Sequence, residues 1–454
     1  MGALIAAMSL VLLRLPVLLG GDAPTTTEKF LPFVPFILVI VLRFATPGRW
    51  RVDTSRALIT ALFLGLMVIA ALRAIGMTTS FTPADAAIQI GRDLLLVLFG
   101  LAVFVRDSNE PRRQSAIRAL CWAPAIYVAA NVALYTIGIQ PDRLSPEPID
   151  QPAEMLGLIG IHHLRTFFPM GVGVNTFGIT VGIAISISII LAVRSSGWRR
   201  TAAVAATAVS FYAILLTDSR GPLLAALAGA AAVLLFNRQS AAPSRNLGRF
   251  AYLVPFSPAI VIGALALLQN VAQQSNGIGR GSLATGSNRL YVWEPILQQF
   301  SSFNVEHLFG YGLFGQVTSG VSAKYAYLFA DATYVPAAHN YVLQMMLDVG
   351  YLGLAVAIAL FVVLVRGFAD AARSGSMAAD ALLAGVVTLI LVGFTEAAPT
   401  VYSLEAYLFF LLVVSAGVSR SLAPLPVAES ARPRQVAGLS PAHRPLGAPV
   451  RAMR

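Results

Sequence analysis

Long runs of apolar residues, separated by short polar segments, recur along most of the chain. A helix needs about 20 mostly apolar residues to span a bilayer, with a range of about 17–25. The pattern predicts an all-α polytopic membrane protein with about twelve transmembrane helices, at 3–20, 30–43, 57–75, 88–105, 116–137, 172–193, 201–216, 222–236, 251–268, 349–365, 379–394 and 404–418. The first run lacks a preceding basic stretch and an Ala-x-Ala-like cleavage site, so we interpret it as a retained helix.

The composition supports a membrane protein. Of the 454 residues, 57% are hydrophobic and 12% are charged, whereas soluble domains have about 45–50% apolar and about 25% charged residues. This excludes a soluble enzyme and widespread disorder. The net charge of +11 does not indicate a nucleic-acid partner, because the arginines fall in short clusters between apolar runs. The single cysteine, Cys121, excludes an intrachain disulfide and a Cys-based metal site.

Basic residues are distributed unevenly between alternate loops. One side of the predicted membrane domain holds 21 Lys and Arg residues and the other holds nine. Because cytoplasmic loops carry the excess of positive charge, both termini are predicted to be cytoplasmic. The predicted location is therefore a cytoplasmic membrane, and membrane lipids are predicted partners.

Two predicted external segments, 140–171 and 269–338, are too long to be simple connections. The second is inserted into a membrane domain that we place at 1–418. Within it, Leu290, Trp293, Leu297 and Phe300 recur at helical spacing and predict a short amphipathic helix lying on the membrane. The tail 419–454 is rich in Pro, Ala and Arg without apolar periodicity, and it is predicted to be disordered and cytoplasmic.

External arginines and one histidine are the candidates for chemistry. Arg220 lies in a very short turn at the start of a helix, where a guanidinium and free backbone N–H groups suit phosphate. A local pair between Asp218 and Arg220 is the alternative. Arg289 begins the amphipathic stretch, where it either holds a lipid phosphate or anchors the helix. His339 lies where the long loop enters a helix, and it is either a proton acceptor or a structural histidine.

Metal binding is not predicted. His162 and His163 are adjacent, so their side chains point apart, and no carboxylate lies at a suitable spacing. The external carboxylates are scattered without the spacing of an acid/base couple.

Three blocks, in this order, resemble the O-antigen ligase and polymerase superfamily of integral-membrane glycosyltransferases. The turn Thr-Asp-Ser-Arg-Gly at 217–221 is similar to the family's Ser-Arg-Gly turn. The stretch 287–293, with Phe-Gly-Tyr-Gly at 309–312, is similar to its Arg-x-x-x-Trp and Gly-x-Gly block. The run that begins at His339 and Asn340 resembles its His-Asn helix, with Asp348 where the family usually has glutamate. Arg165 with Asn-Thr-Phe-Gly at 175–178 is a looser fourth match.

The resemblance implies a metal-independent, cofactor-free enzyme of the bacterial inner membrane with a periplasmic active site. Its donor would be a glycan on undecaprenyl diphosphate, and its acceptor a hydroxyl of lipid A-core or of a growing polysaccharide. By this resemblance Arg220 and Arg289 would neutralise the leaving diphosphate, and His339 would take the acceptor proton or orient the hydroxyl. The predicted substrate-binding residues are Arg165, Asn175, Trp293, Asn340 and Arg92, the last without a motif.

Other functions remain open from the sequence alone. A polymerase or a protein glycosylase of the same superfamily would share the blocks. A secondary transporter or lipid flippase suits the predicted spans, but it would favour charges at mid-membrane and repeats between halves. A non-catalytic scaffold for polysaccharide assembly would tolerate changes at Arg220 and His339.

Overall fold

The computed structural model describes residues 31–76, 81–106, 110–139, 152–239, 289–328 and 337–419, together with positions 11, 256, 259 and 260. Within these ranges the chain is helical, and its only β-type pairs are three isolated bridges. The all-α prediction is therefore confirmed for this part of the chain. Most of the predicted helices 3–20 and 251–268 and the tail from 420 onward lie outside the described residues, as do segments 269–288 and 329–336 of the long loop.

Ten apolar helices coincide with ten of the predicted spans. They are α3 (Val34–Ala45), α4 (Thr54–Ala74), α5 (Pro83–Gly100, continued by the π-helix η2, Leu101–Val105), α6 (Glu110–Thr136), α8 (Val174–Arg194), α9 (Trp198–Thr217), α10 (Arg220–Gln239), α17 (Tyr341–Arg373), α18 (Met377–Val392) and α19 (Leu404–Gly417). In the described ranges, six are long and apolar enough to cross a membrane: α4, α5 with η2, α6, α8, α9 and α17. The other four are shorter apolar helices.

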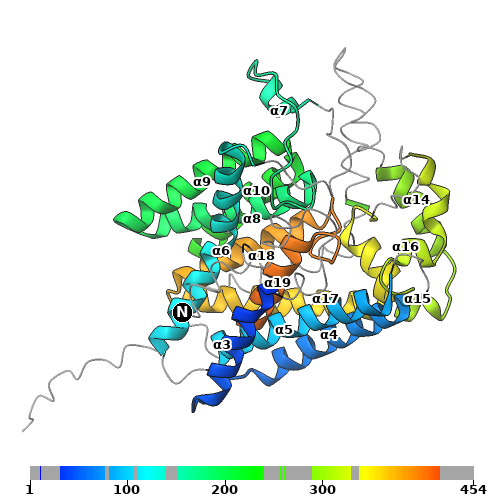
Figure 1. Cartoon of the computed structure of the whole chain (residues 1–454), viewed down its shortest axis with the longest axis horizontal. Helices are drawn as coiled ribbons and strands as arrows, with labels where there is room; N and C mark the ends of the chain where they lie inside the picture. The colour runs from blue at the N-terminus through cyan, green and yellow to red at the C-terminus, as the bar shows by residue number, and fades with distance from the viewer. Residues whose placement is uncertain are drawn as a thin grey trace, which may run out of the picture.

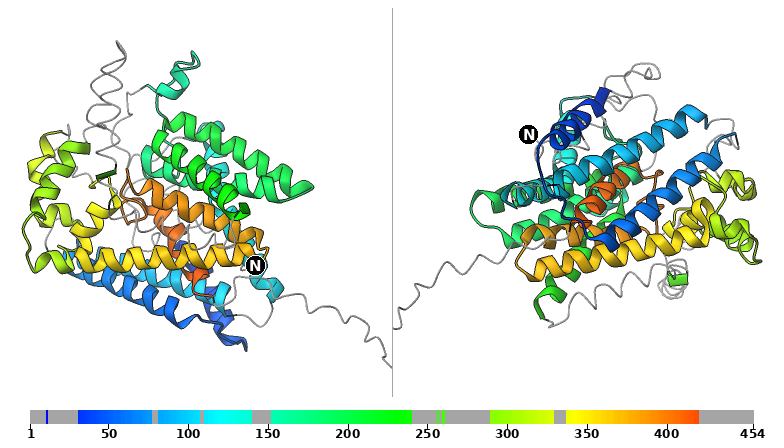
Figure 2. Two further views of the ribbon diagram at one scale, coloured as in Figure 1. Left: turned by 180° about the vertical axis from the view of Figure 1, so that it is seen from behind. Right: turned by 90° about the horizontal axis from the view of Figure 1, so that it is seen from below.

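Short helices fill the connections. They are α7 (Glu154–Gly157), α14 (Arg289–Gln299), α15 (Glu306–Phe309), α16 (Gly315–Thr318) and the single turns η1 (Leu31–Phe33), η4 (Val321–Lys324) and η5 (Ala326–Leu328). In Figure 1, α8, α9 and α10 lie together, and α3, α4, α5 and α17 form another layer. Figure 2 shows α14, α15 and α16 gathered around the first turns of α17, which all three contact.

Helix starts follow from local sequence. The Asp53 side chain accepts from the backbone N of Arg56 at the start of α4. Thr82 and Asp85 form a reciprocal capping box around Pro83 at the start of α5. The Ser376 side chain accepts from the backbone N of Ala379 at the start of α18. These caps satisfy N–H groups that have no partner within the helix.

The outer faces of α3 and α4 are apolar. Val34, Leu38, Leu58 and Leu62 are among the large apolar side chains that remain about half exposed or more, between 47% and 61%. A water-facing helix would carry polar residues at such positions. Exposed apolar faces on long apolar helices are instead typical of contact with lipid.

A loop docks onto a break in α17. Gly350 has φ 69° inside this helix, so the helical hydrogen-bond pattern is interrupted there. The carbonyls of Leu347 and Asp348 accept from the backbone N of Tyr311 and Gly312, at 2.6 and 3.0 Å. A Cβ added to Gly310 would lie 2.5 Å from backbone atoms around Gly350. The glycines of the predicted Gly-x-Gly block therefore permit a close backbone contact.

Candidate active site

Glu396 lies between two of the predicted site residues. The Arg289 guanidinium donates to Glu396 Oε1, and His339 Nδ1 lies 3.2 Å from Glu396 Oε2. The Glu396 side chain is 9% exposed, whereas Arg289 and His339 retain 23% and 26%. The carboxylate is therefore buried beneath a guanidinium and an imidazole that both reach the surface.

Backbone and capping contacts bring His339 to Glu396. Asn340 caps α17 by accepting from the backbone N of Leu343, at 3.1 Å. Its Nδ2 donates to the carbonyl of Phe394, at 2.9 Å. The start of α17 is thereby joined to the segment that follows α18 and carries Glu396. His339 has φ 48°, a left-handed conformation that is uncommon for residues other than glycine.

The electrostatics of Glu396 favour its charged form. Burial raises the pKa of this carboxyl, but the Arg289 charge, the hydrogen bond and charge of His339, and the Arg165 charge together outweigh burial. The pKa of Glu396 consequently lies below the ordinary glutamate value. Glu396 is thus a carboxylate at neutral pH.

Arg220 begins α10 and pairs with two carboxylates. Its guanidinium lies 2.6 Å from Glu154 Oε2 and 3.0 Å from Asp218 Oδ2. The local pair with Asp218, considered as an alternative from the sequence, does form. The Arg220 side chain is nevertheless 49% exposed, and exposed ion pairs contribute about 0–1 kcal/mol. An anionic ligand can therefore displace one carboxylate at small cost.

Arg165 connects the turn that contains Arg220 with the start of α8. Its Nε donates to the carbonyl of Thr217 at 3.0 Å, and its NH2 group donates to Asn175 Oδ1 at 2.8 Å. The looser sequence match of Arg165 with Asn175 thus corresponds to a direct contact. Burial lowers the pKa of Arg165, and the Asp218 charge opposes this effect; arginine remains protonated regardless.

These groups belong to one region. A Cβ added to Gly221, next to Arg220, would lie 3.2 Å from Thr395 Oγ1, next to Glu396. The charges of Arg220, Glu154 and Glu396 all act on Arg165. The structure therefore gathers Arg165, Asn175, Arg220, Arg289 and His339 near the ends of α9 and α18 and the starts of α8, α10 and α17.

Two further predicted residues lie beside this region in supporting positions. Trp293 is fully buried, and its Nε1 donates to the carbonyl of Ala338 at 2.7 Å. It holds α14 against the residue that precedes His339. Asn340 is also fully buried by its capping contacts. Neither side chain is exposed for substrate in this structure, so their expected contact with substrate stays a prediction.

Asp348 supports the site from beneath. Its Oδ1 accepts from the backbone N of Gly315, Gln344 Nε2 and Tyr402 OH, at 3.0, 2.9 and 3.2 Å. Although aspartate is shorter than the glutamate usual in the family, it accepts three hydrogen bonds here. These bonds join α16, α17 and the segment after α18.

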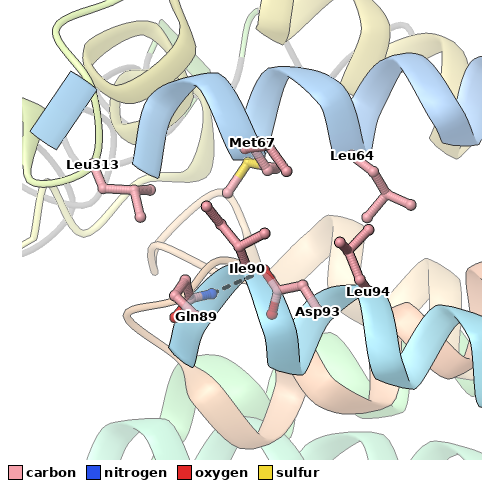
Figure 3. A pocket seen from close by; sticks show the side chains of 8 residues that line it. Leu64, Met67, Gln89, Ile90, Asp93, Leu94 and Leu313 are labelled. Atoms are coloured by element: carbon pink, nitrogen blue, oxygen red, sulfur yellow. Dashed lines mark hydrogen bonds between the residues drawn. The ribbon is translucent and has the colours of Figure 1, made fainter. Parts of the chain in front are cut away.

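Arg92 belongs to another cluster. Its guanidinium lies 3.2 Å from Asp93 Oδ1, while Asp93 Oδ2 accepts from Gln89 at 2.9 Å and from Tyr407 OH at 2.9 Å. Figure 3 shows Asp93 and Gln89 on the wall of a small pocket of about 10 Å³, with Met67 and Leu313 opposite. This volume holds about one water molecule. None of the described contacts of Arg92 reaches Glu396 or Arg220.

Sequence reasoning missed Glu396. One signal was available, because Glu396 is the sole charged residue in the apolar stretch 381–404. An ionisable residue in such a stretch marks a functional position by default. Among the residues that the structure describes, no three His, Cys, Asp or Glu side chains gather as a metal site.

The arrangement suits an anionic ligand and a proton transfer. Three guanidinium groups can bind phosphate oxygens, and an imidazole beside them is held by a carboxylate. A family model described as O-antigen ligase matches residues 204–358, which include Arg220, Arg289 and His339. The match confirms the resemblance to the O-antigen ligase and polymerase superfamily. No curated protein matches the chain.

Proposed function

We propose that the chain is a membrane glycosyltransferase that moves a glycan from undecaprenyl diphosphate to an acceptor hydroxyl. The acceptor is lipid A-core, as in an O-antigen ligase. The observation that carries this proposal is the contact of both Arg289 and His339 with Glu396, beside the turn of Arg220. This arrangement offers positive charge for a diphosphate and an oriented base for a hydroxyl.

The arginines act on the leaving group. As the bond between the sugar C1 and the diphosphate oxygen breaks, negative charge grows on the diphosphate. Arg220 and Arg289 are partly exposed, at 49% and 23%, and they stabilise this charge through hydrogen bonds that strengthen in the transition state. Arg165, held by Asn175, adds a third charge.

His339 acts on the acceptor. With Nδ1–H donating to Glu396, the lone pair of Nε2 is free to accept the proton of the acceptor hydroxyl. The hydroxyl oxygen then bonds to the sugar C1, and the proton moves to Nε2. The resulting imidazolium is stabilised by the carboxylate, so Glu396 is a positioning residue in this scheme.

The wider organisation follows from the sequence. We place about twelve spans within a membrane domain at 1–418, with the loop 269–338 and the site on the periplasmic side of the inner membrane. Both termini, including the tail 419–454, are cytoplasmic. The 21-to-9 distribution of basic residues and the six apolar helices support this arrangement.

The second candidate is a polymerase of the same superfamily, in which the acceptor is another lipid-linked chain. The family match favours neither acceptor. A transporter or flippase is less well supported, because the charged residues that contact one another around Glu396 lie at helix ends rather than within the spans.

A transfer assay with competing acceptors tests the proposal. Purified protein in detergent receives a synthetic undecaprenyl-diphosphate oligosaccharide with both lipid A-core and excess donor, without added metal. Glycan transfer to lipid A-core that Arg220→Ala and His339→Ala both abolish is the expected result. Longer lipid-linked chains would instead identify a polymerase. No transfer by folded protein, together with lipid movement across vesicles, would identify a transporter.

A further inference from the structure

A second cavity lies at the far end of the helices that carry the candidate site. It has a volume of about 210 Å³ and is lined by residues that include Ser115, Arg118, Trp122, Ser195, Trp198 and Arg199. An adjoining hollow of about 370 Å³ shares Ser195, Trp198 and Arg199 with this cavity. Arg194 also lines this hollow. The two hollows form one basic, aromatic-walled depression between α6, the turn from α8 to α9, and the start of α18.

The length of α8 places this depression at the opposite membrane boundary. Asn175 lies at the start of α8 and contacts Arg165 of the candidate site, whereas Arg194 ends the helix. A helix of 21 residues is about 30 Å long. This matches the thickness of about 30 Å of the hydrocarbon core of a bilayer. The depression therefore opens at headgroup level, on the side away from Glu396.

Among the residues that the structure describes, two of its arginines have no carboxylate partner. Arg118 donates to the carbonyl of Gln114 at 3.3 Å, and the Arg199 guanidinium lies 5.8 Å from the ring centroid of Trp198. Across the described ranges, no Asp or Glu forms an ion pair with either residue. By contrast, Arg194 is compensated by Asp380 at 3.2 Å. The depression thus holds two uncompensated positive charges from two different helices.

We propose that this depression binds the phosphate of an anionic phospholipid. Arginine binds phosphate oxygens through paired N–H groups, and the hydroxyls of Ser115 and Ser195 line the same space. Trp198, 75% exposed, provides an amphipathic ring of the kind found at headgroup level. Leu191 and Trp122 give an apolar wall against which an acyl chain packs. Basic pockets between helices at a membrane boundary favour anionic headgroups.

Native mass spectrometry of the full chain in mild detergent tests this site. The probes are phosphatidylglycerol and phosphatidylethanolamine with identical acyl chains, and inorganic phosphate is the competitor. Arg118→Gln and Arg199→Gln are compared with Arg200→Gln, which removes the same charge from an exposed neighbour that does not line the cavity. We expect phosphatidylglycerol to be retained preferentially, and each of the first two changes to weaken its binding by roughly fivefold.

Arg200→Gln should leave phosphatidylglycerol binding within about twofold of wild type. Equal losses in Arg199→Gln and Arg200→Gln would overturn the proposal, because they would reveal a diffuse charge effect. Equal retention of both lipids by wild type would also overturn it, and this result needs no variant to fold. Displacement of the lipid by inorganic phosphate would show that the depression binds free phosphate instead.

Discussion

His339 Nδ1 lies 3.2 Å from Glu396 Oε2, although the two residues are 57 positions apart in the chain. This contact orients the imidazole ring and fixes which of its nitrogens faces outward. Because Arg289 contacts the other oxygen of the same carboxylate, one buried group positions both side chains.

Arg289→Lys should lower the transfer rate by roughly 10- to 100-fold. Lysine keeps the positive charge but loses the planar fork that can hold Glu396 and a phosphate oxygen together. Initial rates of glycan transfer from the lipid-diphosphate donor measure the effect. The control is Arg200→Lys, at an exposed position in the first turn of α9, the end of this helix opposite the turn of Arg220. Wild-type activity in Arg289→Lys would mean that charge alone suffices.

Glu396 should make stability depend on pH in acid. The pKa of its carboxyl is lower in the folded chain than the ordinary 4.5, so its stabilising effect is complete above that value and is lost as the pH falls through the folded pKa. The gap in melting temperature between wild type and Glu396→Gln should therefore narrow as the pH falls below about 4.5. Melting curves in detergent measure it. A gap that widens on acidification would contradict the charge environment described for Glu396.

Asp348→Ala should lower the free energy of unfolding by about 1–3 kcal/mol. The change leaves buried donors on Gly315, Gln344 and Tyr402 without their shared acceptor. Unfolding by SDS titration in mixed micelles gives the value. Asp370→Ala, which removes an exposed pair with Arg373, should change stability by less than about 1 kcal/mol. Similar effects of the two changes would show that the Asp348 hydrogen bonds add little.

Gly310→Ala should destabilise the chain more than Gly320→Ala. Both glycines have φ near 72°, so alanine strains the backbone at either position. Only at Gly310 would the added Cβ meet backbone atoms of α17, because the space around Gly320 is open. Melting temperatures of the two variants isolate the packing contribution. Equal melting temperatures would contradict the close contact between Gly310 and Gly350.

Apolar periodicity predicted the helices well, because a helix in lipid must be apolar over most of its length. The same pattern placed Arg220 and His339 next to helix starts, and Arg165 and Arg289 in the long connections between the predicted spans. The motifs also included Gly310 and Gly350. Their close backbone contact, however, could be recognised only in the folded structure.

Contacts between distant segments could not be read from the sequence. Glu396 has no motif around it, and its importance depends on the hydrogen bond that the Asn340 side chain donates to the carbonyl of Phe394. Likewise, the motif around Trp293 gave no sign that its ring is buried and that its Nε1 donates to the carbonyl of Ala338. Its contact with substrate stays a prediction. The sequence gives the chemistry of each side chain, but it does not show which distant residues that side chain contacts in the fold.

The most direct test of the central claim is a double-mutant cycle on the transfer rate. His339→Ala, Glu396→Gln and the double variant are compared with wild type, with His162→Ala as an exposed histidine control. If Glu396 acts through His339, each single change should lower the rate by roughly 100-fold or more, and the double variant should be little worse than His339→Ala. Losses that multiply in the double variant would show independent action and contradict the account.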